Sequence, residues 1–269
     1  MKRNKKRTKV IIATTCASIA LLASFYFIHL KFFFDLDAIQ VLQNIASPNT
    51  RYIKITEGMR KEEVAERFAK TLGWSGVEKQ SFLDTYALAV RGKSEGYLYP
   101  ATYLMAVNTK PKAASQKILD TFTREVTDKE EKLIKKIINM DTAIKIASLI
   151  QREASDKNDM KIISGIIWNR LFEGMPLGID ATLQYAKGKE GKWWPQVKPE
   201  DKKIVSPFNT YKNKGLPPSA ISNPGKAAID AALNPTLTKA LYYLHDDDGN
   251  IRTATTYQGH LANIEKYYR

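Results

Sequence analysis

The stretch DTAIKIASLIQREA at residues 141–154 predicts an amphipathic helix that carries a carboxyl group on its apolar side. Helical residues advance by about 100° each, which places Leu149 and Ile150 on one stripe with Ile146. Glu153 lies about 20° from Ile146 on the same projection, at the centre of that stripe. The helix therefore predicts an acid that points toward the core rather than toward water.

The polar residues of this segment occupy the other side of the predicted helix. Asp141 suits the N-cap position, where a carboxylate oxygen accepts hydrogen bonds from unpaired backbone amides. The opposite face collects Lys145, Ser148, Arg152 and Ser155. We expect that face to be solvated. Glu153 lies on the opposite, apolar face, where a solvated acid is not expected.

A carboxyl group on a core-facing stripe is a candidate general acid. Loss of hydration disfavours the charged form and raises the pKa toward the range in which the group can donate a proton. Cleavage of a glycosidic bond needs such an acid. A second interpretation stays open, in which the helix ends near Ala154 and Glu153 bends to water or pairs with a lysine.

A second helix is predicted over residues 160–172, and Gly174 and Pro176 end it. Its Asn169 lies between two apolar positions, so its amide either ties down backbone in the core or reaches into a site.

Three segments further along are dense in amides and hydroxyls: DATLQY at 180–185, SPFNTY at 206–211 and GLPPSAISNPG at 215–225. Rigid loops of this kind suit a carbohydrate cleft, although each piece alone could be ordinary turn chemistry. The predicted substrate-binding residues are Asn169, Asp180, Thr182, Gln184, Tyr185, Asn209, Thr210, Tyr211 and Asn223.

The N-terminus predicts a membrane anchor. Six basic residues precede an uncharged run that begins at Val10, and the first acid after it is Asp35. A span needs roughly 20 apolar residues, and basic residues stay on the cytoplasmic side. We expect a cytoplasmic tail at 1–9, a single transmembrane helix at 10–30, and the rest of the chain outside the cytoplasm.

Charge and composition narrow the partners and the chemistry. The net charge is +14, and about eight positive charges remain without the basic tail. An anionic partner is expected, and the predicted topology excludes nucleic acid while leaving wall polymers and lipid headgroups. The single cysteine, Cys16, lies in the predicted span, and the three histidines lack ligand spacing, so we expect no metal and no cofactor.

The remaining pattern predicts an α+β fold in two small subdomains. Residues 51–56 read as a strand, the segment KEEVAERFAKTLG as a helix closed by Gly73, and residues 102–105 as a returning strand. Clustered tyrosines near residue 97 either pack a small core or stack on sugar rings. A lysine-rich helix over 113–136 is expected to connect the membrane-proximal region, 31–112, to a mixed helix and strand subdomain, 113–269.

The sequence resembles the endolytic lytic transglycosylases of the MltG (YceG-like) family from about residue 51 onward. The segments that carry the resemblance are EGYLYPATY, IASLIQREAS, IIWNRLFEGMPLGIDATLQYA, SPFNTYKNKGLPPSAISNPG, AALNP and LYYLHDDDGNIRTATTYQGH. The resemblance implies an N-terminal anchor, a LysM-like subdomain that binds peptidoglycan, and a catalytic subdomain. It further implies that the enzyme cuts nascent glycan strands internally, which would terminate their elongation, with wall synthases as potential partners.

The family's glutamate motif has two acids, and here Gln151 stands at the first position and Glu153 at the second. The resemblance therefore assigns the acid and base role to Glu153. Ala181 is another departure, because many relatives have proline there. In such enzymes the acid protonates the glycosidic oxygen, and its carboxylate then takes the proton of the C6 hydroxyl of N-acetylmuramic acid, which closes an anhydro ring. A muramidase-type hydrolase and a non-catalytic wall-binding scaffold remain the alternatives.

Overall fold

The computed structural model describes residues 47–127 and 139–267. The expected tail and anchor at 1–30 lie outside these residues. No helix within the described ranges is long and apolar enough to cross a bilayer. Residues Arg51–Arg269 form one compact unit, and the predicted boundary between residues 112 and 113 stays a prediction.

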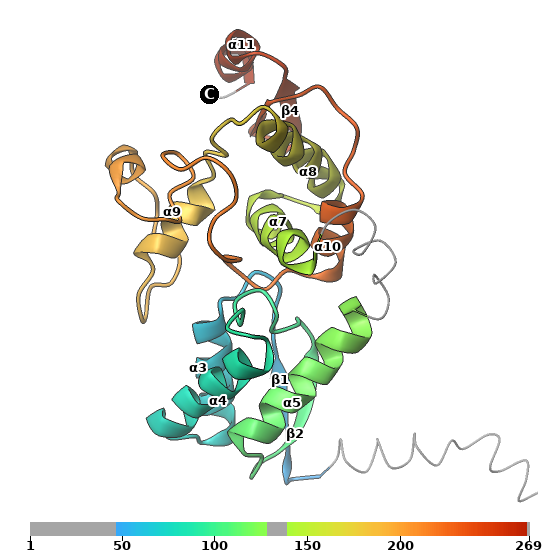
Figure 1. The fold of residues 1–269 in the computed structure, drawn as a ribbon, viewed down its shortest axis with the longest axis vertical. Helices are drawn as coiled ribbons and strands as arrows, with labels where there is room; N and C mark the ends of the chain where they lie inside the picture. The colour runs from blue at the N-terminus through green and yellow to red at the C-terminus, as the bar shows by residue number, and fades with distance from the viewer. Residues whose placement is uncertain (1–46, 128–138, 268–269) are drawn as a thin grey trace, which may run out of the picture. The chain divides into compact units, whose positions relative to one another are not determined.

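The structure is a mixed helix and strand, α+β fold, as the sequence predicts, and the described residues of the first half of this unit form two strands and three helices (Figure 1). Its elements are β1 (Thr50–Lys54), α3 (Lys61–Leu72), α4 (Gly76–Ala89), β2 (Thr102–Ala106) and α5 (Pro111–Phe122). β1 and β2 pair in a two-stranded sheet, while α4 packs against both α3 and α5. Both strands and the α3 helix expected from the sequence are confirmed.

The α3 helix forms where its apolar spacing and its end signals agree. Val64 and Phe68 are fully buried on one face, and the Phe68 ring stacks on Phe82 of α4 at 5.3 Å between centroids. Gly73 ends the helix in the left-handed conformation, with φ of 68°. A residue with a side chain would be strained at that position.

Two of the clustered tyrosines pack inside the molecule, whereas Tyr99 is half-buried. Tyr97 is 9% exposed and Tyr103 is 3% exposed, and the Tyr97 ring lies 5.0 Å from that of Phe122. The packing interpretation is therefore confirmed for these two residues, which are too buried to offer a ring face to a sugar.

The predicted connecting helix is only partly confirmed. α5 starts with Pro111 in its first turn, where a missing amide proton costs nothing. It ends at Phe122 and continues as the π-helical turn η1 (Thr123–Thr127). The second part of the expected helix, residues 128–136, lies outside the described residues.

The second half of the unit is built around α7 (Met140–Glu153). It contacts α8 (Lys157–Phe172), α9 (Asp180–Lys187) and α10 (Lys226–Leu233). The N-cap of α7 is Asn139, whose side chain accepts a hydrogen bond from the Thr142 amide. The expectation of Asp141 as N-cap was wrong, and that residue instead pairs with Lys93 and Lys145.

Part of the predicted solvated face of α7 is in fact buried. Ser148 is fully buried, because the segment before α10 packs over it and the Ile221 amide donates to its hydroxyl at 3.1 Å. Helical periodicity shows which residues share a face, but it cannot show that a later segment will cover the polar face as well.

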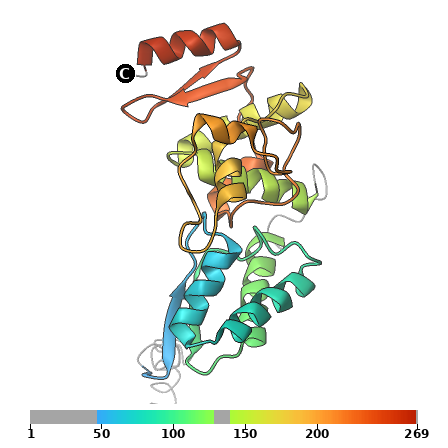
Figure 2. The same ribbon diagram turned by 90° about the vertical axis from the view of Figure 1, so that its left-hand side faces the viewer.

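The predicted second helix is confirmed as α8, which begins at Lys157 with Asp156 as N-cap. The segment DATLQY, expected as a loop, forms α9 instead. A long irregular stretch with the short turn η2 (Pro199–Lys203) follows. At the C-terminal end, β3 (Tyr242–His245) and β4 (Ile251–Ala254) form an antiparallel hairpin, and α11 (Tyr257–Tyr267) packs along it (Figure 2).

Candidate active site around Glu153

Glu153 is the last residue of α7, next to the point where the chain leaves the helix. Its side chain is half-buried, while Ile146, Leu149 and Ile150 of the same stripe are fully buried. The stripe therefore runs from the core to a carboxyl group at its outer end. The alternative of a glutamate that bends into open water does not describe this geometry.

The hydroxyl of Tyr243 on β3 donates a hydrogen bond of 2.6 Å to Oε2 of Glu153. Burial raises the pKa of the Glu153 carboxyl above its usual value, and this effect outweighs the opposing influence of the Tyr243 hydrogen bond. The side chain is thereby favoured in its neutral form, in which it can donate a proton.

Asp180 lies at the start of α9 and contributes to the same electrostatic environment. Its negative charge also raises the pKa of Glu153. The Tyr211 hydroxyl donates to Oδ1 of Asp180 at 2.6 Å, and the Asp180 side chain remains exposed. Two carboxyl groups with different environments, one half-buried and one solvated, therefore face the same region.

Arg170 holds the backbone around this region in place. Its guanidinium donates to the carbonyl of Leu177, ahead of α9, and to that of Leu241, ahead of β3. The segments that carry Asp180 and Tyr243 are thus tied to one α8 side chain. Gly178 lies beside this arrangement with a positive φ of 61°, a backbone conformation in which a side chain would be strained.

A histidine and an aspartate form a second polar pair near the carboxyl. Nε2 of His245 on β3 lies 2.9 Å from Oδ2 of Asp159 on α8, which is only 6% exposed. The charge of His245 lowers the pKa of Glu153, in opposition to burial. The β3 strand therefore brings two side chains, Tyr243 and His245, toward the end of α7.

A profile of the YceG-like family matches residues 26–266. The chain belongs to the YceG-like family. Its fold agrees with a crystal structure of a YceG-like protein from Listeria monocytogenes, with a TM-score of 0.69 and 26% identity; the match covers 81% of this chain and 76% of that one.

Curated relatives of this YceG-like chain have a named activity. An endolytic murein transglycosylase of Bacillus subtilis is 33% identical over 271 residues, which cover 91% of this chain and 72% of that protein. A protein of the same name from Streptococcus pneumoniae is 31% identical over 180 residues. Those residues cover 66% of this chain and 33% of that relative, so the pneumococcal protein is much longer than the region it shares.

Four predicted binding residues of this YceG-like chain are buried and make contacts within the protein: Thr182, Asn209, Thr210 and Asn223. The Thr182 and Thr210 hydroxyls lie 3.0 Å apart, and the Ile179 amide donates to the Thr210 hydroxyl. These bonds fix the start of α9, and with it Asp180, against the loop that carries Tyr211.

Asn209 and Asn223 make comparable contacts in their loops. The Asn209 amide donates to the carbonyls of Lys202 and Ile204, and its oxygen accepts from the Tyr211 amide. Asn223 Nδ2 donates to the Met59 carbonyl at 2.8 Å. Both side chains therefore shape the loops beside the site, and a direct contact of either with substrate stays a prediction.

Gln184 and Tyr185 lie on the half-buried side of α9. The Tyr185 hydroxyl donates to Oε2 of Glu95 at 3.1 Å, a carboxyl that is 4% exposed. Burial raises the pKa of Glu95 to about 8. Tyr185 thus joins α9 to the first half of the unit.

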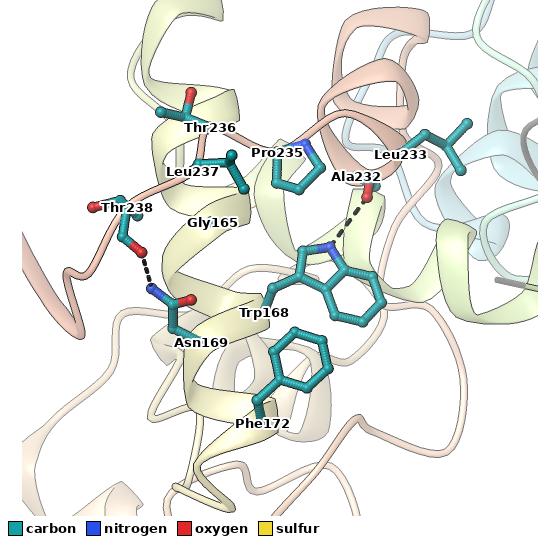
Figure 3. A pocket seen from close by; sticks show the side chains of 10 residues that line it. All are labelled: Gly165, Trp168, Asn169, Phe172, Ala232, Leu233, Pro235, Thr236, Leu237 and Thr238. Atoms are coloured by element: carbon teal, nitrogen blue, oxygen red, sulfur yellow. Dashed lines mark hydrogen bonds between the residues drawn. The ribbon is translucent and has the colours of Figure 1, made fainter. Parts of the chain in front are cut away.

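Asn169 lies on a cavity of about 420 Å³ that α8 forms with residues 232–238. Its amide donates to the backbone carbonyl of Thr238 at 2.8 Å (Figure 3). The lining of this largely apolar cavity does not include Glu153. The structure thus shows the backbone-tying role of Asn169, while a role in sugar binding stays a prediction.

Sequence reasoning did not single out Tyr243, Arg170 or His245. All three lie in segments that carry the family resemblance, which is the signal that could have marked them. In the ranges 47–127 and 139–267, no group of three or more histidine, cysteine, aspartate or glutamate side chains could hold a metal ion.

Proposed function

We propose that this chain is an endolytic murein transglycosylase that uses Glu153 as its acid and base. The observation that carries the proposal is the half-buried carboxyl of Glu153, whose pKa burial raises and whose Oε2 accepts from Tyr243. The relatives from Bacillus subtilis and Streptococcus pneumoniae, both named endolytic murein transglycosylase, support the same reaction.

The reaction needs one carboxyl group that works twice. The neutral Glu153 donates its proton to the glycosidic oxygen between N-acetylmuramic acid and N-acetylglucosamine, and the bond from that oxygen to the muramyl C1 breaks. The resulting carboxylate then takes the proton of the muramyl C6 hydroxyl, whose oxygen bonds to C1 and closes the anhydro ring. Glu153 regains its proton, and no water is consumed.

Surrounding groups support both protonation states of this carboxyl. Burial and the charge of Asp180 favour the neutral acid before bond cleavage. Once Glu153 is a carboxylate, the Tyr243 hydroxyl bond stabilises it. Asp180, held by Tyr211, places a negative charge near the region where the sugar ring becomes positive in the transition state.

The test is the product formed by purified chain and isolated glycan strands. We expect strands that end in anhydro-muramic acid, and we expect Glu153→Gln to bind strands but to release none. Asp230→Asn, which changes an acid of α10, is the control and should release the same products as the wild type. Mass spectrometry separates the alternatives, because a hydrolase would give products heavier by one water.

Products that carry the extra water would support the muramidase-type hydrolase. Strands that co-sediment with the wild type and remain intact would support the non-catalytic scaffold. Retained turnover in Glu153→Gln would remove that residue from the mechanism.

We also propose that residues 10–30 anchor the chain in the cell membrane as a single pass, with the N-terminus cytoplasmic and the catalytic part outside. The basic residues ahead of Val10 support this topology. In cells, the full chain should fractionate with membranes, and external protease should digest residues after the span. A chain without residues 1–30 that still sediments with membranes would contradict the anchor.

The first half of the compact unit is proposed to be the LysM-like subdomain that binds peptidoglycan. The order β1, α3, α4, β2, with both strands in one sheet, supports this proposal. Its association with wall synthases stays a prediction from the family resemblance. Binding of purified sacculi by the Glu153→Gln chain should weaken when residues of this half are replaced by alanine, and unchanged binding would count against the subdomain's role.

A further inference from the structure

Arg152 precedes Glu153 on α7, and the catalytic proposal gives it no role. The guanidinium lies over the ring of Trp194, with 3.8 Å from its central carbon to the ring centroid. Both side chains are half-buried. An arginine that stacks on an aromatic ring uses the face of its planar group, so the N–H groups at its edge remain able to donate.

One N–H group of this guanidinium has no hydrogen-bond acceptor in the part of the chain that the structure describes. Its Nε is buried, and within the described ranges no acceptor lies at hydrogen-bond distance from it. An unpaired buried donor is costly, and one that belongs to a cation more so. Structural arginines elsewhere in the chain differ: Arg170 donates to two backbone carbonyls, and Arg60 donates to Tyr185 and pairs with Glu62.

The nearest acids do not neutralise Arg152 through direct bonds. Glu63 attracts it through space, but Oε2 of Glu63 already accepts from the Trp194 indole at 3.0 Å and from the Arg60 amide at 2.9 Å. Glu153 attracts it as well, and that carboxyl is bonded to Tyr243. The guanidinium therefore stays a cation beside the catalytic carboxyl, and its buried Nε has no acceptor among the described residues.

Arg152 belongs to the second half of the unit and lies close to residues of the first half. A Cβ on Gly58, in the turn between β1 and α3, would meet its Nη1 at 3.3 Å. Trp194 is held over α3 by its bond to Glu63. A polymer that passes Glu153 would thus meet a cation and an indole on its way to the proposed glycan-binding half.

We propose that Arg152 and Trp194 form a subsite that binds a carboxylate of the glycan strand next to the bond that is cut. A carboxylate accepts two parallel hydrogen bonds from the guanidinium edge, and the indole offers apolar surface to the sugar that bears it. Muramyl residues carry such carboxylates, either on the lactyl group of peptide-free strands or on the stem peptide. This subsite rests on the proposed function, because it assumes that glycan strands bind next to Glu153.

The experiment measures binding rather than turnover, so that it does not depend on catalysis. Glu153→Gln chain is titrated with peptide-free glycan fragments, with peptide-bearing fragments, and with both after their carboxylates are converted to amides. Arg152→Gln in this background should weaken binding of the untreated fragments about tenfold or more, which matches the loss of a charge-assisted hydrogen bond. It should change the affinity for amidated fragments less than twofold.

Two further variants separate recognition from packing. Arg152→Lys keeps the charge without the planar fork, so it should recover only part of the affinity. Trp194→Phe keeps a ring face and should retain the preference for untreated fragments. Arg124→Gln, an exposed arginine paired with Glu125, is the matched control and should bind as the parent does.

The outcomes divide cleanly. If Arg152→Gln weakens binding of peptide-free fragments, the ligand of Arg152 is the lactyl carboxylate. If it weakens binding of peptide-bearing fragments alone, the ligand is a carboxylate of the stem peptide. Either result supports the subsite. Equal weakening on untreated and amidated fragments, or no weakening at all, overturns it. A wild-type chain that cleaves no strand would refute the proposed function, while the charge-dependent binding would still report on Arg152.

Discussion

Tyr243 donates a hydrogen bond of 2.6 Å to Oε2 of Glu153, and this bond joins β3 to the last turn of α7 across 90 positions of sequence. It stabilises the charged carboxylate, whereas burial stabilises the neutral acid. Burial prevails, because the pKa of Glu153 is raised. The charge of Asp180 raises this pKa as burial does. The Tyr243 hydrogen bond and the Asp180 charge can be removed one at a time, which yields predictions of opposite sign.

Tyr243→Phe should raise the pKa of Glu153 further, because the bond that lowers it is lost. A general acid must be protonated, so activity falls as pH rises through its pKa, and this limb of the kcat/KM profile should move to higher pH by up to about one unit. The maximal rate should drop, since the carboxylate formed after protonation loses its donor. Tyr257→Phe, on α11 and 54% exposed, is the control. A limb that moves to lower pH would contradict the assignment.

Asp180→Asn should move the same limb in the opposite direction. The charge of Asp180 raises the pKa of Glu153, so its removal lowers that pKa, and the acid deprotonates at lower pH. The pH dependence of kcat/KM measures the shift, with Asp230→Asn as a control that should leave the profile in place. If Asp180 instead activates water as a hydrolytic base, the variant should lose nearly all turnover at every pH.

Glu95→Gln should change how stability depends on pH. The pKa of Glu95 is raised from 4.5 to about 8 by burial. Between these values the folded chain binds a proton that the unfolded chain releases, so the free energy of unfolding falls as pH rises through this window. The variant does not lose stability in this window. Its free energy of unfolding at pH 9 should exceed that of the wild type by a few kcal/mol at most, since one pKa unit equals about 1.4 kcal/mol.

Urea unfolding at pH 5 and at pH 9 measures the Glu95 effect, and the advantage of the variant should be small or absent at pH 5. Glu78→Gln serves as the control, because hydrogen bonds to Ser75 lower, rather than raise, the pKa of that half-buried carboxyl. It should give no gain at pH 9. A Glu95→Gln chain that is less stable than the wild type at pH 9 would show that the charged carboxylate stabilises the fold.

Asn223→Ala should destabilise the chain by about 2–5 kcal/mol, because a fully buried amide loses both its bonds. Its oxygen accepts from the Leu98 amide and its nitrogen donates to the Met59 carbonyl, each at 2.8 Å. The shift of the urea midpoint measures the effect. Asn234→Ala, an exposed residue at the end of α10, should cost under about 1 kcal/mol, and equal losses would refute the special role of Asn223.

Gly165→Ala should destabilise the packing of α8 against residues 235–238. A Cβ at this position would lie 2.2 Å from the backbone oxygen of Thr236, so the segment must move, and a cost of about 1–3 kcal/mol is expected. Gly76→Ala is the matched control, because its Cβ would meet nothing within 4 Å. It should be neutral or slightly stabilising by thermal unfolding, since alanine favours a helix.

The local elements could be predicted because their signals are local. Val64, Phe68 and Gly73 place and end α3 through periodicity and a left-handed C-cap. The stripe of Ile146, Leu149 and Ile150 likewise marks the buried side of α7 and the position of Glu153 at its end. Helix boundaries were less certain, as the N-cap Asn139 shows, because several neighbouring polar residues can cap one helix.

Segments with mixed signals were harder to predict. DATLQY has the amides and hydroxyls of a loop, yet it forms α9 because Thr182 and Thr210 bond to each other and to the backbone of Ile179. Ser148 has a polar side chain at a position where packing over α7 leaves no access to water. In both places, contacts from distant parts of the chain outweigh the local preference.

The sequence by itself determined that a carboxyl group would stand at the end of an apolar helical stripe, because helical geometry relates residues three and four positions apart. It also carried the motifs of the YceG-like family. Only the tertiary structure decided what that carboxyl meets. Tyr243 lies 90 positions from Glu153 in sequence, and Asp180 and Arg170 lie on two other helices, α9 and α8. Their approach to Glu153 depends on how α8, α9 and β3 pack around α7, where many weak contacts act together and no single stretch of sequence records the result.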